Sequence, residues 1–208
     1  MNARIDLSLS RREFLKASGA LVVSAAGPAF IGETLAQTAA VSTGSKPPLL
    51  PTELDSWVAI LPDGRVTAFF GKMDMGQSLD IAIAQIVADE LDVDVAKVDV
   101  VMGDTALTCN QGGASGSTGI QTGARPLRSA AAEARRLLVQ SASQKLGLPV
   151  EQLRVDDGVV SAVSDPRKKA AYAELIGGRH FHHQVEWNKQ IGNPMDIKVE
   201  AKPKSPSD

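Results

Sequence analysis

The longest regular pattern in the sequence covers residues 125–146 and predicts an amphipathic helix. Apolar residues recur there at helical spacing, and most of the charged residues fall elsewhere on the helix. The apolar set consists of Leu127, Ala130, Ala131, Ala134, Leu137, Leu138 and Ala142. Gly147 is placed to cap the C-terminus, with Pro149 just beyond it. A helix with one apolar face packs against a second layer, so we expect a layered fold.

A second helix is predicted over residues 79–91, which are mainly Leu, Ile, Ala and Val with one polar stripe. Each helix is followed by a short crossover and a predicted strand, at 98–102 and at 153–155. The sequences at the two helix ends also resemble one another. We therefore expect two helix-to-strand units that pack on one sheet, which is an α+β architecture.

Two turn sequences predict β-hairpins. In Pro62-Asp63-Gly64, proline fixes φ and glycine accepts a positive φ, and Asp156-Asp157-Gly158 is a second hairpin signal. The flanking strands are predicted at residues 57–61, 65–70, 153–155 and 159–162. A short helix is predicted near 170–176, and no element is predicted beyond Gly177. The expected fold is α+β, with β-hairpins and a sheet packed against two main helices.

The N-terminal residues have the order of a secretory signal, with a basic segment followed by an apolar stretch and small residues. Residues 10–16, Ser-Arg-Arg-Glu-Phe-Leu-Lys, match the twin-arginine export pattern. The match is carried by Arg11, Arg12, Phe14 and Leu15. A transmembrane anchor is the alternative, but the stretch is weakly apolar and contains glycine and proline. We expect residues 1–36 to be a signal peptide and the protein to be periplasmic, with any membrane association made through partners.

The composition of the full chain limits its function. The formal net charge is −2, which gives no electrostatic case for a nucleic-acid partner. Cys109 is the only cysteine, so the chain holds neither a disulfide framework nor an iron–sulfur cysteine set. We predict a linker over residues 37–55, an α+β domain over 56–165, and the start of a truncated following region over 166–208.

Residues 71–78, Gly-Lys-Met-Asp-Met-Gly-Gln-Ser, form a loop that could bind a ligand. The loop joins a predicted strand to a helix N-terminus, where free backbone N–H groups and the helix dipole favour an anion. Gly76 permits close approach to the backbone, and Gln77 offers both donors and an acceptor. The alternative is a simple strand-to-helix turn with Ser78 as the N-cap, and Asp74 is poorly placed for binding an anion.

Residues 111–119, Gln-Gly-Gly-Ala-Ser-Gly-Ser-Thr-Gly, form a similar loop, again just before a helix. Successive small residues can form a concave nest of N–H groups, and three hydroxyl side chains add donors. The sequence is neither a P-loop nor a GxGxxG fingerprint, and it lacks the lysine and acidic metal ligands that a phosphate-binding enzyme needs. A flexible polar loop is the alternative.

The other candidate residues are weaker. His180, His182 and His183 lie close together, but no carboxylate or cysteine has a recognisable metal-ligand spacing to them, which favours a solvated loop. Cys109 has no activating histidine nearby in the sequence and is interpreted as a bystander thiol. No Ser/His/Asp signature is present, so we predict no catalytic residue and no metal ligand.

Several segments along residues 57–178 together match one known family. They are Trp57-Val58-Ala59-Ile60, Pro62-Asp63-Gly64-Arg65-Val66, Met75-Gly76-Gln77, Ala84-Gln85-Ile86-Val87-Ala88, Gly103-Asp104-Thr105, the run from Gln111 to Ser117, the helix from Arg128 to Leu138, and the run from Tyr172 to Gly178. In this order they resemble the N-terminal part of the molybdopterin-binding large subunit of the xanthine dehydrogenase/aldehyde oxidase family. The isoquinoline 1-oxidoreductase and exported aldehyde dehydrogenase type is the most similar branch.

The resemblance implies a molybdenum–molybdopterin cofactor that both loops line. It places Gly76, Gln77 and Ser78 against the pterin or its phosphates, together with a run of the second loop. That run is Gly113, Ala114, Ser115, Gly116 and Ser117. The family hydroxylates aldehydes or N-heterocycles with oxygen derived from water, and the electrons leave through an iron–sulfur subunit or domain.

Three departures from the family pattern shape the expected function. The family glycine after Gly76-Gln77 is Ser78 here, and a later serine of the second loop is replaced around Thr118-Gly119-Ile120. Family large subunits also run several times further, to a catalytic glutamate without a counterpart here. We expect an N-terminal fragment of an exported molybdenum hydroxylase large subunit, inactive alone. Its partners would be the remaining large-subunit segments, an iron–sulfur small subunit and the twin-arginine translocase. The alternative is a non-catalytic exported α+β protein that has lost cofactor binding.

Overall fold

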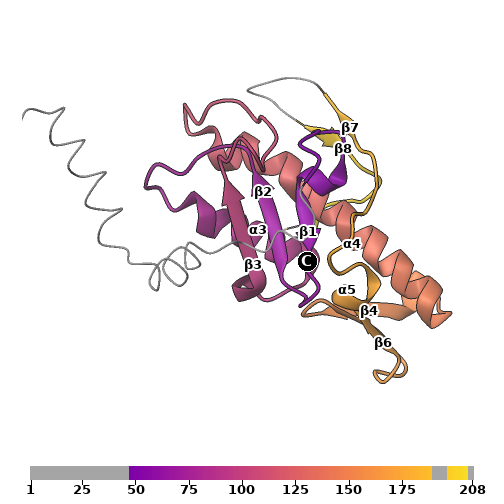
Figure 1. The fold of residues 1–208 in the computed structure, drawn as a ribbon. Helices are drawn as coiled ribbons and strands as arrows, with labels where there is room; N and C mark the ends of the chain where they lie inside the picture. Colours follow the sequence, from indigo (N-terminus) through magenta and orange to yellow (C-terminus); the bar gives the residue numbers. More distant parts are fainter. Residues whose placement is uncertain (1–46, 189–195, 206–208) are drawn as a thin grey trace, which may run out of the picture. The chain divides into compact units, whose positions relative to one another are not determined.

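The computed structural model describes residues 47–188 and 196–205 (Figure 1). These residues belong to one compact unit, Ser42–Asp208. The predicted signal peptide, residues 1–36, lies outside the described residues. None of the helices in the described part is long and apolar enough to cross a membrane.

The central sheet has three strands in the order β1-β2-β3, namely β1 (Val58–Ile60), β2 (Val66–Phe70) and β3 (Val98–Met102). β1 and β2 are antiparallel and form the predicted hairpin, in which Gly64 has a φ of +87°. β2 and β3 are parallel. Every residue of β2 is buried, as is typical of a central strand covered on both faces.

Two helices pack on this sheet. α3 (Leu79–Leu91) is the crossover from β2 to β3, and α4 (Ala124–Leu146) contacts α3 as well as β1 and β2. Both helices lie where the periodicity predicts them. Gly147 ends α4 in the left-handed conformation, with a φ of +67°, which confirms the predicted C-cap.

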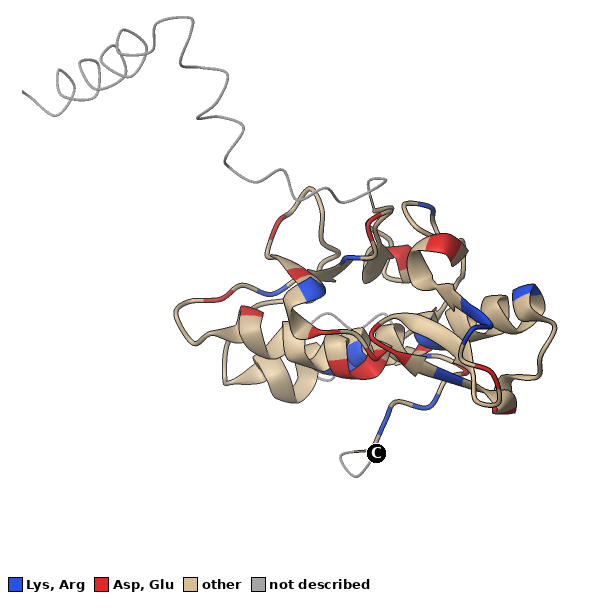
Figure 2. Cartoon of the chain, turned by 90° about the horizontal axis from the view of Figure 1, so that it is seen from below, with Lys and Arg blue, Asp and Glu red and all other residues tan. Residues whose placement is uncertain are grey.

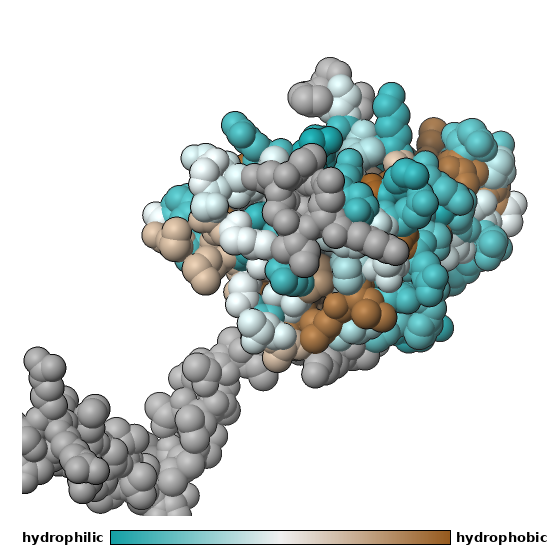
Figure 3. Space-filling model, turned by 90° about the horizontal axis from the view of Figure 1, so that it is seen from above, coloured by the Kyte–Doolittle hydropathy of each residue, from teal (hydrophilic) through white to brown (hydrophobic). Residues whose placement is uncertain are grey.

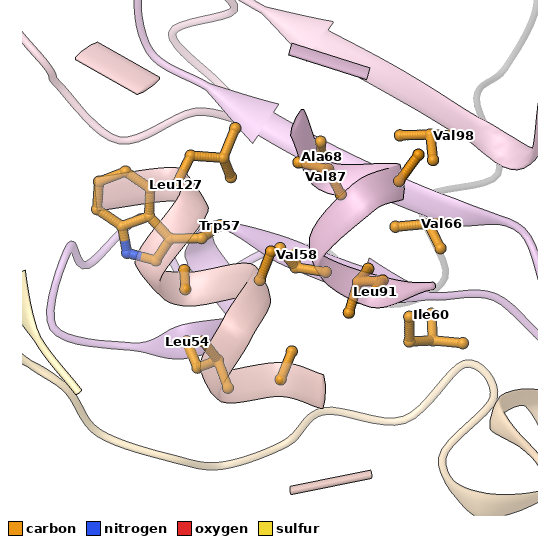
Figure 4. Packing of buried hydrophobic residues seen from close by; sticks show 14 of the residues in the cluster. Leu54, Trp57, Val58, Ile60, Val66, Ala68, Val87, Leu91, Val98 and Leu127 are labelled. Atoms are coloured by element: carbon orange, nitrogen blue, oxygen red, sulfur yellow. The ribbon is translucent and has the colours of Figure 1, made fainter. Parts of the chain in front are cut away.

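The buried core lies between these helices and the sheet. Figure 4 shows Val66 of β2, Leu91 of α3 and Leu127 of α4 among its side chains. The predicted apolar face of α4 packs on this core, with Leu137 only partly buried. Glu133 of α4 is charged, yet its side chain is fully buried and pairs with a neighbouring arginine. Burial of that carboxylate is possible because it is paired.

The two helix-to-strand units do not share a sheet, contrary to the prediction. β4 (Leu153–Asp156), β5 (Val159–Ala162) and β6 (Lys169–Ala171) form a separate antiparallel sheet. The local similarity is nevertheless present, because a 3₁₀ turn joins helix to strand in both units, at Val95–Lys97 and at Val150–Gln152. The strands β3 and β4 nevertheless pair with different neighbours, because strand pairing depends on tertiary context more than on local sequence.

The C-terminal part of the described chain contains more regular structure than the sequence indicates. The helix predicted near 170–176 is observed as β6 followed by the shorter α5 (Tyr172–Leu175). Beyond it, β7 (Glu186–Trp187) and β8 (Ile197–Lys198) form a two-stranded antiparallel sheet that the sequence did not predict. Such short strands carry too few residues to show an alternating pattern.

Candidate cofactor-binding site

Both candidate loops leave the same end of the central sheet (Figure 1). The first loop, residues 71–78, follows β2, and the second loop, residues 111–119, lies in the segment that follows β3. Because β2 and β3 are parallel neighbours, their carboxyl ends lie side by side and the loops emerge together. The first loop leads into α3, and the second leads through a π-helical turn, Gly119–Gly123, into α4. The fold therefore brings together two segments that are distant in the sequence.

Asp74 caps the N-terminus of α3. Its carboxylate accepts hydrogen bonds from the backbone N–H groups of Gly76, Gln77 and Leu79 at 2.7–2.9 Å. Burial by itself raises the pKa of Asp74, but these N–H groups lower it below its ordinary value. Ser78 occupies the N-cap position, as the alternative interpretation of this loop predicts, but it makes no side-chain cap hydrogen bond. The N–H groups expected to be free for an anion are thus already bound to a carboxylate.

Gln77 presents its carboxamide at the surface of the first loop. The side-chain Oε1 accepts a hydrogen bond from the backbone N–H of Met75 at 2.8 Å. The carboxamide nitrogen then remains as a donor, without a partner among the residues that the structure describes. An added Cβ at the adjacent Gly76 would meet no atom within 4 Å. The first loop therefore offers a side-chain donor beside open space.

Gln111 and Lys72 join the two loops. The buried Gln111 side chain accepts a hydrogen bond from Gly71 N–H at 2.6 Å and donates one to the carbonyl of Gly123 at 3.1 Å. The Lys72 ammonium donates a hydrogen bond to the carbonyl of Gly113 at 2.7 Å. These contacts fix the second loop against the end of β2 and place a positive charge beside Gly113.

Lys72 is buried at the junction of the loops, and no acidic side chain pairs with it in the described part of the chain. Burial lowers the pKa of its ammonium below the ordinary value. Its methylene chain packs on Gly123, where an added Cβ would lie 2.7 Å from two Lys72 carbons. Over the fold as a whole, Lys and Arg are interspersed with Asp and Glu (Figure 2). Lys72 differs from these surface charges because it is desolvated.

The middle of the second loop offers hydrogen-bond donors at the surface. Ser115 and Ser117 are exposed, and an added Cβ at Gly113 would meet no atom within 4 Å. Gly116 and Ser117 both have a positive φ, of +60° and +58°. Thr118 Oγ1 is buried and has no hydrogen-bond partner within the described ranges. Neutral donors close to one buried ammonium suit a ligand with a phosphate or a polar heterocycle.

The structure brings together the loops that hold the residues predicted to bind a cofactor. Those residues are Gly76, Gln77, Ser78, Gly113, Ala114, Ser115, Gly116 and Ser117. Lys72 and Gln111, which hold the loops in place, are not among the residues predicted to bind the cofactor. Lysine and glutamine are usually exposed, so no sequence signal indicated that these two would be buried.

Apolar side chains are exposed around the loops. Met73 and Met75 of the first loop are 53% and 70% exposed, and Ile120 of the π-helical turn is 43% exposed. Figure 3 shows small hydrophobic patches within a mainly hydrophilic surface. Exposed methionines beside a candidate site are typical of a surface that contacts another protein segment.

Comparison with known families identifies the fold. A family model described as the molybdopterin cofactor-binding domain matches residues 27–202. The chain belongs to this family. The predicted molybdopterin cofactor and the predicted α+β fold are thereby confirmed, because the match covers both loops, both main helices and the two three-stranded sheets.

This molybdopterin-binding domain is similar to segments of longer proteins. It is 38% identical over 176 residues to a nicotinate dehydrogenase polypeptide of Pseudomonas putida, a match that covers 85% of this chain and 14% of that protein. It is 32% identical over 179 residues to the beta chain of isoquinoline 1-oxidoreductase from Brevundimonas diminuta, a match that covers 81% of this chain and 22% of that protein. The chain thus spans less than a quarter of the length of either relative.

A solved structure of reconstituted CO dehydrogenase from Oligotropha carboxidovorans has a similar fold. Its TM-score is 0.51 at 21% sequence identity, over 67% of this chain and 18% of that chain. At this level of identity the similarity supports the fold of the molybdopterin-binding domain and nothing finer.

Proposed function

We propose that this domain forms part of the wall that binds molybdopterin in the large subunit of a molybdenum hydroxylase. Two similar proteins are named a nicotinate dehydrogenase and an isoquinoline oxidoreductase, which supports N-heterocycles as the substrate class, with aldehydes as the alternative. The structural observation that carries the proposal is the pair of loops that Lys72 and Gln111 join at one end of the sheet.

The residues of the two loops fit the cofactor. Molybdopterin carries a phosphate and a polar pterin ring, which call for hydrogen-bond donors and, at the phosphate, for positive charge. Gln77, Ser115 and Ser117 supply exposed neutral donors, while Lys72 adds a buried positive charge nearby. The space beside Gly113 leaves room for the ligand. When bound, the cofactor supplies the molybdenum redox chemistry, and the residues of this domain bind and orient it.

The proposed large subunit would have partners and a periplasmic location. Because the chain spans 14% of the nicotinate dehydrogenase polypeptide, further large-subunit segments would complete the site. The exposed Met73 and Met75 are suited to contact such segments. An iron–sulfur subunit would carry the electrons away. The arginine pair Arg11 and Arg12 supports export by the twin-arginine translocase to the periplasm.

Gly113→Val tests the site without straining the backbone. Gly113 has no positive φ, and the valine side chain would extend into the open space proposed for the cofactor. The chain is expressed with segments that match the remainder of the nicotinate dehydrogenase polypeptide, in cells that make molybdopterin. Molybdenum in the purified complex is measured by mass spectrometry, and the pterin is measured by fluorescence after oxidation. We expect the wild-type complex to retain both and the Gly113→Val complex to lose most of both.

Two further variants sharpen this test. Gln77→Ala removes the exposed donor of the first loop and should also lower pterin content. Arg167→Ala is the matched control, since Arg167 is 91% exposed and pairs locally with Asp165. A wild-type complex without molybdopterin would contradict the proposal and favour a non-catalytic protein that has lost cofactor binding. Equal pterin content in wild type and Gly113→Val would place the cofactor away from the second loop.

A further inference from the structure

His180 and His182 lie beside Asp55, although Asp55 is distant from them in the sequence. The candidate ligand atoms, a carboxylate oxygen and one nitrogen from each imidazole, lie within 4.8 Å of one another. The two imidazole rings have centroids 5.4 Å apart and are tilted by 51°. Tertiary structure therefore supplies the carboxylate partner that the histidine segment lacks in the sequence. The carboxylate whose absence from the sequence favoured a solvated loop is therefore present in the fold.

Backbone contacts hold this cluster in position. Leu54 N–H donates a hydrogen bond to the carbonyl of His183 at 2.9 Å, which fixes the two segments against each other. The Asp55 carboxylate accepts hydrogen bonds from the N–H groups of Phe181 and His182 at 2.7 and 3.0 Å, one on each oxygen. A carboxylate offers about four lone-pair sites, so both oxygens retain capacity to bind a cation.

One property of the histidines points to a ligand, and a second shows that their backbone is held in an unusual conformation. His180 Nε2 is buried and has no hydrogen-bond partner in the part of the chain that the structure describes. His182 has a φ of +52°, a left-handed conformation that is strained for a non-glycine residue. Buried polar atoms in proteins are normally satisfied. A cation bound through His180 Nε2 would satisfy this buried nitrogen.

We propose that Asp55, His180 and His182 bind a divalent transition metal ion. Two imidazole nitrogens and one carboxylate oxygen suit Zn²⁺ and chemically similar ions, with water completing the coordination. Metal–ligand bonds of about 2.0–2.2 Å place tetrahedral ligand atoms roughly 3.3–3.6 Å apart. Binding would therefore draw the ligand atoms, now within 4.8 Å of one another, closer together, and the His182 side chain is exposed. The ion would then link two segments that are far apart in the chain.

Other soft or nitrogen ligands do not compete with this cluster. The chain has three histidines, and the third, His183, is hydrogen-bonded through Nε2 to the buried Glu133 at 2.9 Å. Burial raises the pKa of the Cys109 thiol to about 12, so this cysteine is not a thiolate at neutral pH. The nearest cation in the sequence, Arg179, donates a hydrogen bond to the carbonyl of Leu175 at 2.6 Å.

The test uses the full-length chain, purified without a histidine tag and stripped of metal with a chelator. Zn²⁺ binding is measured by calorimetry, and Co²⁺ binding is measured by its visible absorption. We expect one Zn²⁺ per chain and a higher Tm in its presence, because a ligand that binds only the folded state stabilises that state. His180→Gln and His182→Gln should each weaken Zn²⁺ binding by about tenfold or more.

His183→Gln is the matched control, since it replaces the adjacent imidazole yet keeps a donor for Glu133. It should bind Zn²⁺ as wild type does. Asp55→Asn tests the carboxylate, with circular dichroism as the check on folding. If that variant does not fold, His182→Gln decides, because its side chain is exposed. Absence of stoichiometric Zn²⁺ would overturn the proposal, as would wild-type affinity in His180→Gln and His182→Gln or an equal loss in His183→Gln.

Discussion

The Lys72 ammonium donates a hydrogen bond to the Gly113 carbonyl at 2.7 Å and so ties together loops that follow different strands. The bond joins a buried cation to an exposed loop. One side chain can span the distance because β2 and β3 are parallel neighbours. The geometry of the candidate site therefore depends on a lysine that was not among the residues predicted to bind the cofactor.

The free energy of unfolding should depend on pH through Lys72. Burial lowers the pKa of its ammonium in the folded protein, whereas the unfolded chain has the ordinary value of 10.5. The unfolded state therefore binds more protons between these two pKa values, so stability rises with pH across that window. Urea unfolding of wild type and Lys72→Met is compared from about pH 7 up to 10.5. Wild-type stability should rise relative to the variant, and a constant difference would show that the lysine titrates normally.

Ser78→Gly should stabilise the protein. Ser78 has a φ of +56° and makes no cap hydrogen bond, and this conformation costs a non-glycine residue about 1–2 kcal/mol. The greater freedom of glycine in the unfolded chain offsets about 0.4–1 kcal/mol of the gain. We expect a net gain of about 0.5–1 kcal/mol in urea unfolding. Ser78→Ala keeps the Cβ and should match wild type; a clear loss in that variant would reveal a contact of the hydroxyl.

Glu133→Gln should destabilise the protein by about 2–3 kcal/mol. The buried carboxylate pairs with Arg136 at 2.5 Å, accepts the N–H of Ala201 at 2.8 Å and contacts His183 at 2.9 Å. Burial by itself raises the pKa of Glu133, but these partners lower it below its ordinary value, so the neutral amide removes a favoured charge. Thermal and urea unfolding measure the loss. Glu151→Gln, at an exposed position, should change stability by less than about 0.5 kcal/mol.

Cys109 should resist alkylation in the folded protein. Its thiol is buried, and burial raises its pKa to about 12, so little reactive thiolate is present at neutral pH. Labelling with iodoacetamide, followed by intact mass measurement, should be slow without denaturant and complete in urea. Rapid labelling of the native chain would instead indicate that the segment just before the second loop opens, because the Cys109 carbonyl lies against Gly71.

The helices and hairpins were predictable because their determinants are local. The periodicity over residues 79–91 and 125–146 reports a buried face directly, and Gly147 supplies the positive φ that ends α4. Strand partners were not predictable in the same way. The helix-to-strand units that end in β3 and β4 have similar sequences, yet these strands join different sheets. Sheet pairing is decided by contacts between distant segments, which a local pattern does not contain.

The sequence by itself determined the two main helices and the identity of both glycine-containing loops, since each rests on residues that are close together in the chain. It also determined the family, because the order of several short segments along the chain is enough to show it. Only the tertiary structure decided that Lys72 and Gln111 would be buried between the loops, that Asp74 rather than Ser78 would cap α3, and that Asp55 would lie beside the histidines. Burial and partner choice depend on which segments meet in space. A polar side chain is then desolvated or paired by neighbours that its own sequence context does not reveal.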